Sequence, residues 1–439
     1  MGAMRANRAR WFAVAFAAAL VAAGCGSTAA GRKLVAVPVV STARAPHVEP
    51  CGPGTPTPSD EIGVTADAIT VGVAADATGA RALFLSNWQS MEAFAAFCNS
   101  MGGIGGRRLD VRLFDTNTFN HRAAMLDSCS SVFALVGSAS AFDGDGATIE
   151  SDCGIPDVPA LVAEPAHGRV PTVVAPVPDP QNLFLIGPQR YLASKEPAAV
   201  RHSGMAYLNV GVTALRATRQ VEASRTVGYH FTSVDAISAL NTSADIDALV
   251  ARLMARGVRY LSVQGRVADL AKIQTALAAE GAPPAVVDAG PLFYDPSYLT
   301  VAGAAAEGTY VMTQTTPFTD AASVPELARY IEWLARAVPG AAPTAEGVRS
   351  WSAALLFAEA ARRAGAHLDR SSVLEQLRAI HAWDGNGIQV PTDPGAGRAS
   401  SCFAYLRVRS GEFRREYPAS GFACPRDGWL HLRRDFYHL

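Results

Sequence analysis

The chain alternates between short apolar runs and longer stretches in which apolar residues recur every three or four positions. An apolar run of four to eight residues is typical of a buried strand, and the longer periodic stretches are typical of amphipathic helices. Strands separated by helices of this length predict βαβ units and a parallel sheet. In the first half, the predicted strands cover residues 69–74, 109–114, 132–136 and 158–163, and the predicted helices end near residues 99, 130 and 152.

A second block of the same kind begins near Met205. Its predicted strands cover residues 205–209, 226–231, 258–263, 285–288 and 309–312, with periodic helices between them. Three predicted helices follow, at 324–337, 346–364 and 371–381, and a last predicted strand covers residues 403–408. Two α/β blocks followed by helices and a late strand predict two lobes that exchange chain more than once.

The N-terminus has the layout of a secretory signal. Arginines at positions 5, 8 and 10 precede an apolar run at 11–23, which is shorter than the about 20 residues that a membrane span needs. The run closes in Ala22-Ala23-Gly24-Cys25, which resembles the lipobox of bacterial lipoproteins, whose cysteine is acylated. We therefore expect a signal peptide at 1–24, a lipid on Cys25, a tether at 25–59 and a protein anchored on the extracytoplasmic face of a bacterial membrane. An uncleaved anchor or a chance cysteine is the alternative.

Composition narrows the classes of function. The 439 residues are 49% hydrophobic and 18% charged, which suffices for two globular domains. The net charge of −1 offers no basic surface, so we expect no nucleic-acid partner. The six cysteines besides Cys25 predict disulfides, since an even number in an exported chain favours them and none has the spacing of a zinc site. A buried thiol is the alternative, above all for Cys98 on the apolar stripe of the first predicted helix.

The segment between the first two predicted strands carries the clearest motif. The helix ends in Phe97-Cys-Asn-Ser-Met-Gly-Gly-Ile-Gly-Gly-Arg107, whose glycines end a helix and turn the chain into the next strand. With Val132-Phe-Ala-Leu-Val-Gly137, Asp152-Cys-Gly-Ile-Pro156 and the late stretch 348–365, it resembles the type I periplasmic-binding-protein family, specifically the branched-chain amino acid (Leu/Ile/Val) receptor branch of ABC transporters.

The resemblance implies an α/β fold of two Rossmann-like lobes with parallel sheets, joined by a multi-strand hinge. Lobe 1 would comprise residues 60–187 plus 318–382, and lobe 2 residues 188–317 plus 383–430. It also implies a monomer without cofactor or metal, which captures a small polar molecule (amino acid-like or a small carboxylate) by lobe closure for an ABC permease. A ligand-sensing envelope lipoprotein and a secreted enzyme are the alternatives.

The expected ligand site lies at the carboxyl ends of the strands, beside helix N-termini. After the third strand, Ser138, Ser140 and Phe142 open a helix, and family members bind a carboxylate with this loop; serine N-capping is the alternative. Asp76 and Glu164 follow the first and fourth strands and would reach the same edge, either as ligand contacts or as solvated or capping carboxylates.

Lobe 2 would contribute Asn209 and Gln264, each at a strand end. In amino-acid-binding relatives the loop after the next strand supplies an acid for the ligand's ammonium group, but residues 289–293 contain none. A buried ammonium without a charged partner is costly, so an amino acid ligand stays open, with Glu164 or Asp288 as substitutes to consider.

Motifs of common enzymes are missing from the sequence. It contains no Gly-x-Ser-x-Gly, His-Glu-x-x-His, Walker or Gly-x-Gly-x-x-Gly motif. Asp143-Gly-Asp145-Gly resembles the start of a calcium loop, but Gly154 stands where the loop needs an acid. We therefore expect a binding protein rather than an enzyme.

The cysteine pairs follow from the predicted sheet. The helices after the second and third strands would lie side by side, each with a cysteine near its C-terminal end. Two further cysteines flank the hairpin-like segment around the last strand. The remaining two can pair only if the tether folds back onto the first helix. The predicted pairs are Cys129–Cys153, Cys402–Cys424 and Cys51–Cys98.

Overall fold

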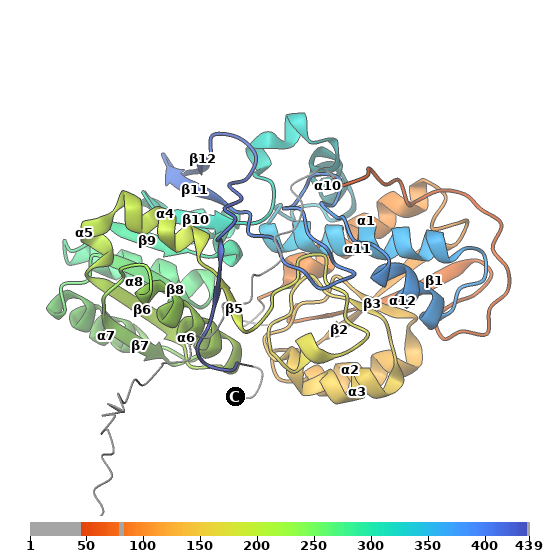
Figure 1. Cartoon of the computed structure of the whole chain (residues 1–439), viewed down its shortest axis with the longest axis horizontal. Helices are drawn as coiled ribbons and strands as arrows, with labels where there is room; N and C mark the ends of the chain where they lie inside the picture. Colours follow the sequence, from red (N-terminus) through yellow and green to blue (C-terminus); the bar gives the residue numbers. More distant parts are fainter. Residues whose placement is uncertain (1–44, 79–82, 437–439) are drawn as a thin grey trace, which may run out of the picture. The chain divides into compact units, whose positions relative to one another are not determined.

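The structure is a computed structural model that describes residues 45–78 and 83–436. Two sheets with helices packed against them form two lobes, numbered here in chain order (Figure 1). The expected signal peptide, Cys25 and the tether up to residue 44 lie outside the described residues. Within the described ranges, no helix combines the length and the apolar character that crossing a membrane requires.

Lobe 1 is built on a parallel sheet of the order β2-β1-β3-β4. Strand β1, in the interior of this sheet, is buried on both faces. One apolar cluster packs it against the first helix and the late helices, and a second cluster packs it against the helices that follow β2 and β3. The strands are β1 (Ala68–Ala75), β2 (Arg108–Asp115), β3 (Ala134–Val136) and β4 (Asp157–Val158). The helices are α1 (Leu85–Ser100), α2 (His121–Ser131), α3 (Ala147–Cys153), α10 (Pro325–Ala337), α11 (Ala345–Ala364) and α12 (Arg370–Arg378), with 3-10 turns η1 (Asp143–Gly146), η2 (His167–Arg169) and η5 (Phe318–Ser323).

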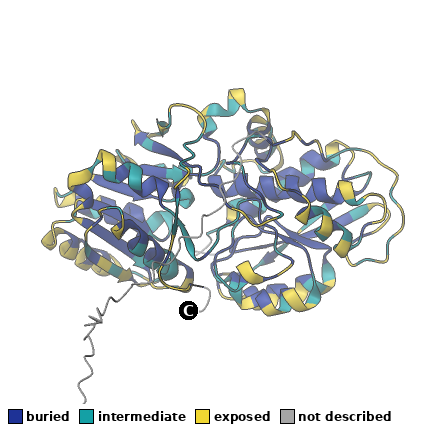
Figure 2. Cartoon of the chain, in the orientation of Figure 1, coloured by how far each residue is buried: buried dark blue, intermediate teal, exposed yellow. Residues whose placement is uncertain are grey.

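Helix α11 returns to lobe 1 after the whole of lobe 2. Every residue from Ala345 to Ala361 is buried, and Figure 2 shows the helix almost entirely in the colour of buried residues. Trp351 packs against Phe94 of α1, with ring centroids 5.0 Å apart, and against Tyr330 of α10, at 5.6 Å. The late helices thus complete the core that the first βαβ unit begins.

Lobe 2 is built on a seven-stranded sheet of the order β12-β11-β10-β9-β8-β6-β7, in which β11 alone runs antiparallel to the other strands. The strands are β6 (Ser203–Leu208), β7 (Phe231–Ile237), β8 (Tyr260–Gln264), β9 (Val286–Ala289), β10 (Tyr310–Thr313), β11 (Ala404–Arg409) and β12 (Glu412–Tyr417). The helices are α4 (Gly187–Lys195), α5 (Pro197–Val200), α6 (Gly211–Arg225), α7 (Ser243–Ala255), α8 (Val267–Ala279) and α9 (Pro296–Ala302), with 3-10 turns η3 (Pro291–Phe293) and η4 (Gly303–Ala306).

Two predicted strands lie elsewhere. The strand predicted at 226–231 is wrong, because the chain turns through Gly228, whose φ of 96° does not fit a strand, and β7 begins only at Phe231. The strand predicted at 158–163 ends at Val158, since Pro159 has no N–H to continue the ladder, and residues 160–162 form a loop.

Contacts near the predicted lobe boundaries show how the crossovers are held. Strand β5 (Leu183–Leu185) pairs with β13 (Trp429–His431), and the next residue, Ile186, packs against Ala223 of α6. Beside the boundary predicted at 382, Trp383 donates its Nε1–H to Ser352 of α11 at 3.0 Å. The lobe boundaries at 187 and 382 stay predictions.

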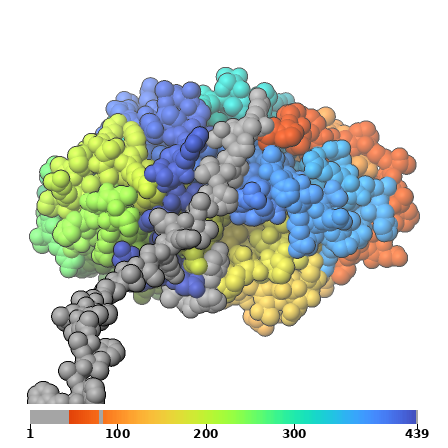
Figure 3. Space-filling view, viewed as in Figure 1, coloured from red at the N-terminus to blue at the C-terminus, as the bar shows by residue number. Residues whose placement is uncertain are grey.

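The three disulfides join Cys51 to Cys98, Cys129 to Cys153 and Cys402 to Cys424, the pairs expected from the sequence. Residues 45–59, predicted to be tether, are instead held on lobe 1. Val48 exchanges two hydrogen bonds of 2.9 Å with the side chain of Asn386, and Ser59 Oγ donates to the Leu368 carbonyl at 2.8 Å. Figure 3 shows this red segment beside the blue surface of the late helices.

Candidate functional site

A cavity of about 170 Å³ lies between the two lobes. Lobe 1 contributes residues 160–162 after β4 and Arg349 of α11, and lobe 2 contributes α6 and the carboxyl ends of β8, β9 and β10. The carboxyl edge of parallel strands is where open α/β sheets bind ligands. Its polar lining residues include Asp179, Gln189, Arg216, Arg219, Gln220, Ser262, Gln264, Asp288, Gln314, Arg349 and Trp429.

Arg219 of α6 holds the crossover between the lobes. Its Nη2 donates to the Leu183 carbonyl at 2.6 Å and to Asp179 Oδ1 at 3.1 Å, and its Nη1 donates to Gln181 Oε1 at 3.2 Å. Most of its hydrogen-bonding capacity is therefore used within the protein. We assign Arg219 to fixing the shape of the cavity.

Arg219 leaves only its Nε unpaired, whereas Arg216 and Arg349 have guanidinium donors that are not held by the bonds which fix Arg219. Nε and Nη2 of Arg216 are buried without a hydrogen bond, and Nε of Arg349 is buried in the same way. Each arginine has a long ion pair with an acid but no hydrogen bond to it, with Asp179 Oδ2 3.8 Å from Arg216 and Glu346 Oε1 3.5 Å from Arg349. Buried donors without partners are costly, so these groups favour an acceptor in the cavity.

The electrostatics of the cluster point the same way. Burial lowers the pKa of Arg216, and the positive charges of Arg219 and Arg349 lower it further against the opposing effect of Asp179. Burial works to raise the pKa of Asp179, but Arg219 and Arg216 hold it below its usual value. Asp179 thus forms ion pairs with Arg216 and Arg219 of lobe 2. The third arginine of the cluster, Arg349, comes from lobe 1. An added anion would relieve the repulsion among them.

Most of the other polar residues that line the cavity are hydrogen-bonded to protein groups. Gln264 donates to Gln220 Oε1 at 2.8 Å, and Gln220 donates to Ser262 Oγ at 3.1 Å. Asp288 accepts from the hydroxyls of Tyr260, at 2.5 Å, and Tyr405, at 3.0 Å, and burial raises its pKa to about 6. Both oxygens of Asp288 are therefore already engaged by hydroxyl groups, which makes it a weak partner for a ligand's ammonium group.

All seven predicted site residues lie within the described ranges, but only Gln264 lines this cavity. Asp76 is buried and accepts from the backbone N–H groups of Thr118, at 2.8 Å, and Ala141, at 3.0 Å. Ser140 Oγ donates to Asp76 Oδ1 at 3.5 Å, and Ser138 Oγ accepts from the Ala74 N–H at 3.1 Å.

These bonds tie the loops after β1, β2 and β3 to one another, and the hydroxyls of Ser138 and Ser140 take part in them. Neither serine caps a helix, because the N-cap residues of η1 and α3 are Phe142 and Gly146 and neither forms a side-chain cap.

Phe142 and Glu164 lie where the lobes touch. A Cβ atom on Gly211, the first residue of α6, would stand 3.1 Å from Glu164 Oε1 and 3.4 Å from Phe142 Cε1. Burial, reinforced by Asp143, raises the pKa of Glu164 to about 7. Asn209 lies outside the cavity, in a separate surface hollow. These predicted residues therefore border the contact between the lobes without lining the cavity.

Arg216 and Arg349 were not predicted from the sequence as site residues. Arg349 carried a usable signal, since it stands between Val348 and Ser350 in a stretch that is otherwise small or apolar, and a charge inside such a helix usually has a purpose. Arg216 carried none, because α6 is rich in polar residues and its arginines look alike in sequence.

The comparisons with known proteins agree with this architecture. A family model described as "Periplasmic binding protein" matches residues 68–412. The chain belongs to the periplasmic binding protein family. Members of this family are solute-binding proteins, and membership implies an extracytoplasmic location for the folded chain. No curated protein matches the sequence.

Solved structures of other periplasmic binding proteins share the fold at low identity. A leucine binding protein from Thermotoga maritima is 18% identical with a TM-score of 0.66, covering 79% of this chain and 97% of its own. A fatty acid ABC transporter substrate-binding protein from Thermomonospora curvata is 16% identical with a TM-score of 0.70, covering 84% and 95%. A branched-chain amino acid transporter substrate binding protein from Streptococcus pneumoniae, in complex with isoleucine, is 15% identical with a TM-score of 0.64, covering 82% and 100%.

Proposed function

We propose that this periplasmic binding protein captures a small carboxylate between its lobes. The observation that carries the proposal is the pair Arg216 and Arg349, which come from different lobes and have buried, unused N–H donors at one cavity. A carboxylate accepts two parallel hydrogen bonds from a guanidinium group, so one anion can engage both arginines. Such an anion would favour the state in which the lobes lie together.

The size of the cavity limits the solute. An engineered protein cavity of about 150 Å³ accepts benzene, so about 170 Å³ suits a solute of similar size. Apolar side chains of Leu161, Val162 and Met312 form part of the wall, which suits a short hydrocarbon tail. The long chain of a typical fatty acid does not fit such a volume.

The charges favour a plain carboxylate over an amino acid. An α-ammonium group needs a free acid, but Asp179 is paired with two arginines and Asp288 is bonded by two tyrosine hydroxyls. Gln264, whose amide points to Gln220, offers only neutral hydrogen bonds. A short branched carboxylate therefore satisfies more of the cavity than leucine or isoleucine does.

We infer that the protein serves an importer in the cell envelope. The sequence Ala22-Ala23-Gly24-Cys25 after an apolar run supports a lipid anchor at Cys25, and the names of the structural neighbours support delivery to an ABC permease. An anchored receptor would present its solute to the permease at the same membrane.

The test compares three solutes of one shape. Isothermal titration calorimetry of the full chain with isovalerate, isovaleramide and leucine separates the carboxylate, the neutral amide and the added ammonium group. We expect isovalerate to bind best. Hydrogen bonds to charged groups contribute about 1.5–3 kcal/mol, so Arg216→Gln and Arg349→Gln should each weaken binding by about 10- to 100-fold.

Arg252→Gln is the matched control, because Arg252 lies on α7 in an exposed ion pair with Asp235. This variant should bind like the wild type. Equal affinity for the amide and the acid, or unchanged affinity in both cavity variants, would contradict the proposal. If none of the three solutes binds, mass spectrometry of solute released on denaturation decides, and a neutral molecule there refutes a carboxylate site.

A further inference from the structure

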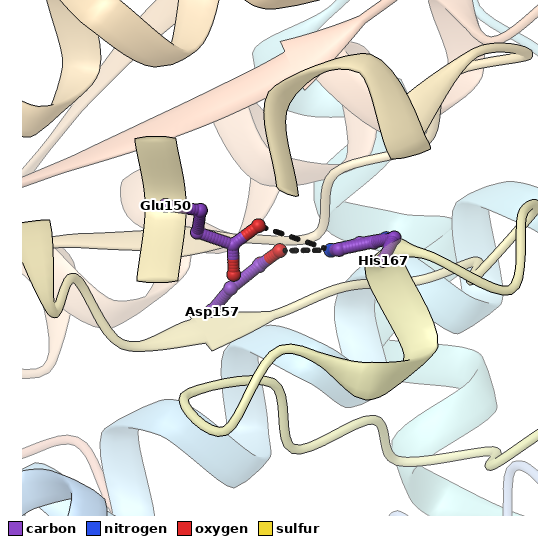
Figure 4. A group of neighbouring side chains, drawn as sticks. All are labelled: Glu150, Asp157 and His167. Carbon is purple, nitrogen blue, oxygen red and sulfur yellow. Dashed lines mark hydrogen bonds and ion pairs between the residues drawn. The ribbon is translucent and has the colours of Figure 1, made fainter. Parts of the chain in front are cut away.

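A second polar centre lies inside lobe 1, away from the residues of the cavity. Glu150 of α3, Asp157 of β4 and His167 of η2 point toward one another, as Figure 4 shows. His167 Nε2 stands 2.9 Å from Asp157 Oδ2 and 3.4 Å from Glu150 Oε2, and all three residues are buried. One ligand atom from each lies within 4.8 Å of the others.

Asp143 fixes the orientation of the imidazole. Its two carboxylate oxygens accept from the backbone N–H groups of Ala163, at 2.6 Å, and Glu164, at 2.8 Å, which makes it an acceptor. The His167 Nδ1, 2.7 Å from Asp143 Oδ2, therefore donates, and Nε2 is left to face Glu150 and Asp157. Metal-binding histidines commonly donate their other ring N–H to a carboxylate in this way.

The buried acids need a cation. Neither oxygen of Glu150 has a hydrogen bond, and Oδ1 of Asp157 has none, although both residues are fully enclosed. A divalent ion beside a neutral imidazole would bring two positive charges to these acids, whereas an imidazolium brings one. Uncompensated charge in a protein interior is costly, so the divalent ion is the better neutraliser.

The distances also suit a metal ion. Bonds of about 2.0–2.2 Å at tetrahedral angles place ligand atoms about 3.3–3.6 Å apart. The separation of 3.4 Å between His167 Nε2 and Glu150 Oε2 lies in this range, and the 2.9 Å to Asp157 Oδ2, a hydrogen bond here, would lengthen by about half an ångström around an ion. One imidazole and two carboxylates are ligands of Zn²⁺ and Mn²⁺.

We propose that Glu150, Asp157 and His167 bind one divalent transition-metal ion, Zn²⁺ or Mn²⁺, inside lobe 1. The sequence analysis expected no metal, because the three ligands share no recognisable spacing motif. The ion would join α3, β4 and η2, and it would close the loop from Asp157 to His167. Residues 160–162 of this loop line the solute cavity, so the ion would stiffen one of its walls. The metal site does not depend on the identity of the solute.

The test measures metal in the full chain, purified without a metal-binding tag. We expect mass spectrometry to find about one Zn or Mn per protein, and EDTA to lower the Tm by several degrees until Zn²⁺ or Mn²⁺ is added back. Glu150→Gln should lose most of the metal and the effect of EDTA. The amide keeps the shape of the acid, and the lost carboxylate oxygens made no hydrogen bonds.

His381→Gln is the control, because His381 forms a comparable pair with Asp393 at 2.8 Å but is largely exposed. It should keep the metal. A wild-type protein without stoichiometric metal and without an EDTA effect would overturn the proposal, as would metal retained by Glu150→Gln. If Glu150→Gln fails to fold, metal content and the EDTA response of the wild type decide alone.

Discussion

Asp288 offers a stability test that uses a single carboxylate. It is buried at the end of β9, and burial raises its pKa from the ordinary 3.8 to about 6 despite the hydroxyls of Tyr260 and Tyr405. Below pH 4 the acid is protonated in both the folded and the unfolded chain. Between pH 4 and pH 6 the folded chain binds more protons, so stability falls as pH rises. Above about pH 6 the full cost of the buried charge remains.

The gap between 3.8 and about 6 corresponds to about 3 kcal/mol. Asp288→Asn removes this cost at pH 8, but at pH 4 only about 0.6 kcal/mol of it is present. The amide also satisfies the two tyrosine hydroxyls less well, at about 1 kcal/mol, but this loss is the same at both pH values. The Tm of Asp288→Asn relative to wild type should therefore rise between pH 4 and pH 8 by about 3 °C, because about 1 kcal/mol shifts the Tm of a chain of this length by only about 1 °C.

Circular dichroism melts of the solute-free protein at the two pH values give this double difference. Titrating groups that do not contact Asp288 contribute equally to the Tm of the variant and of the wild type, so their contributions cancel in the difference. Asp247→Asn, an exposed carboxylate on α7, is the control and should show no such pH dependence. A Tm difference for Asp288→Asn that is equal at pH 4 and pH 8 would refute the reasoning.

Two further predictions concern stability and location. Arg370 donates hydrogen bonds to the carbonyls of Phe133, Cys153, Cys129 and Val132, so Arg370→Met should lower the free energy of unfolding by about 3 kcal/mol and lower the urea midpoint. The same change at an arginine whose guanidinium group is mostly exposed should matter little. A midpoint equal to that of the wild type would show that these bonds contribute nothing. Cys25→Ser should release the protein from membranes, and a variant that stays in the membrane fraction after a high-salt wash would contradict the lipid anchor.

The parts of the fold that the sequence predicted are those with strong periodicity. Strand β1 and helix α11 carry long apolar patterns, as elements enclosed on all sides do, and β2 alternates apolar with polar residues as an edge strand does, so their positions followed from pattern alone. The strand at 226–231 failed because apolar residues around Gly228 pack as a turn rather than as a ladder. The pattern of apolar residues indicates which positions are buried, but it does not distinguish a buried turn from a buried strand.

The site was harder to predict than the fold. The loop with Ser138 and Ser140 was expected at the ligand, but its hydroxyls bond Ala74 and Asp76 within lobe 1. Whether a strand-end polar group faces the cavity or a neighbouring loop depends on side-chain direction, which spacing does not reveal. Arg216 and Arg349 are brought together only by the packing of two lobes that are far apart in sequence.

The attachment of residues 45–59 to lobe 1 has a mechanical consequence. Any tension that reaches the folded chain from its N-terminal side passes first to the bond of Ala45 with Asp384 and the bonds of Val48 with Asn386, and then to the covalent link between Cys51 and Cys98. Hydrogen bonds yield under load, whereas a disulfide does not. The load therefore ends at helix α1, in the core of lobe 1, and the strands that carry the cavity wall of lobe 2 bear none of it.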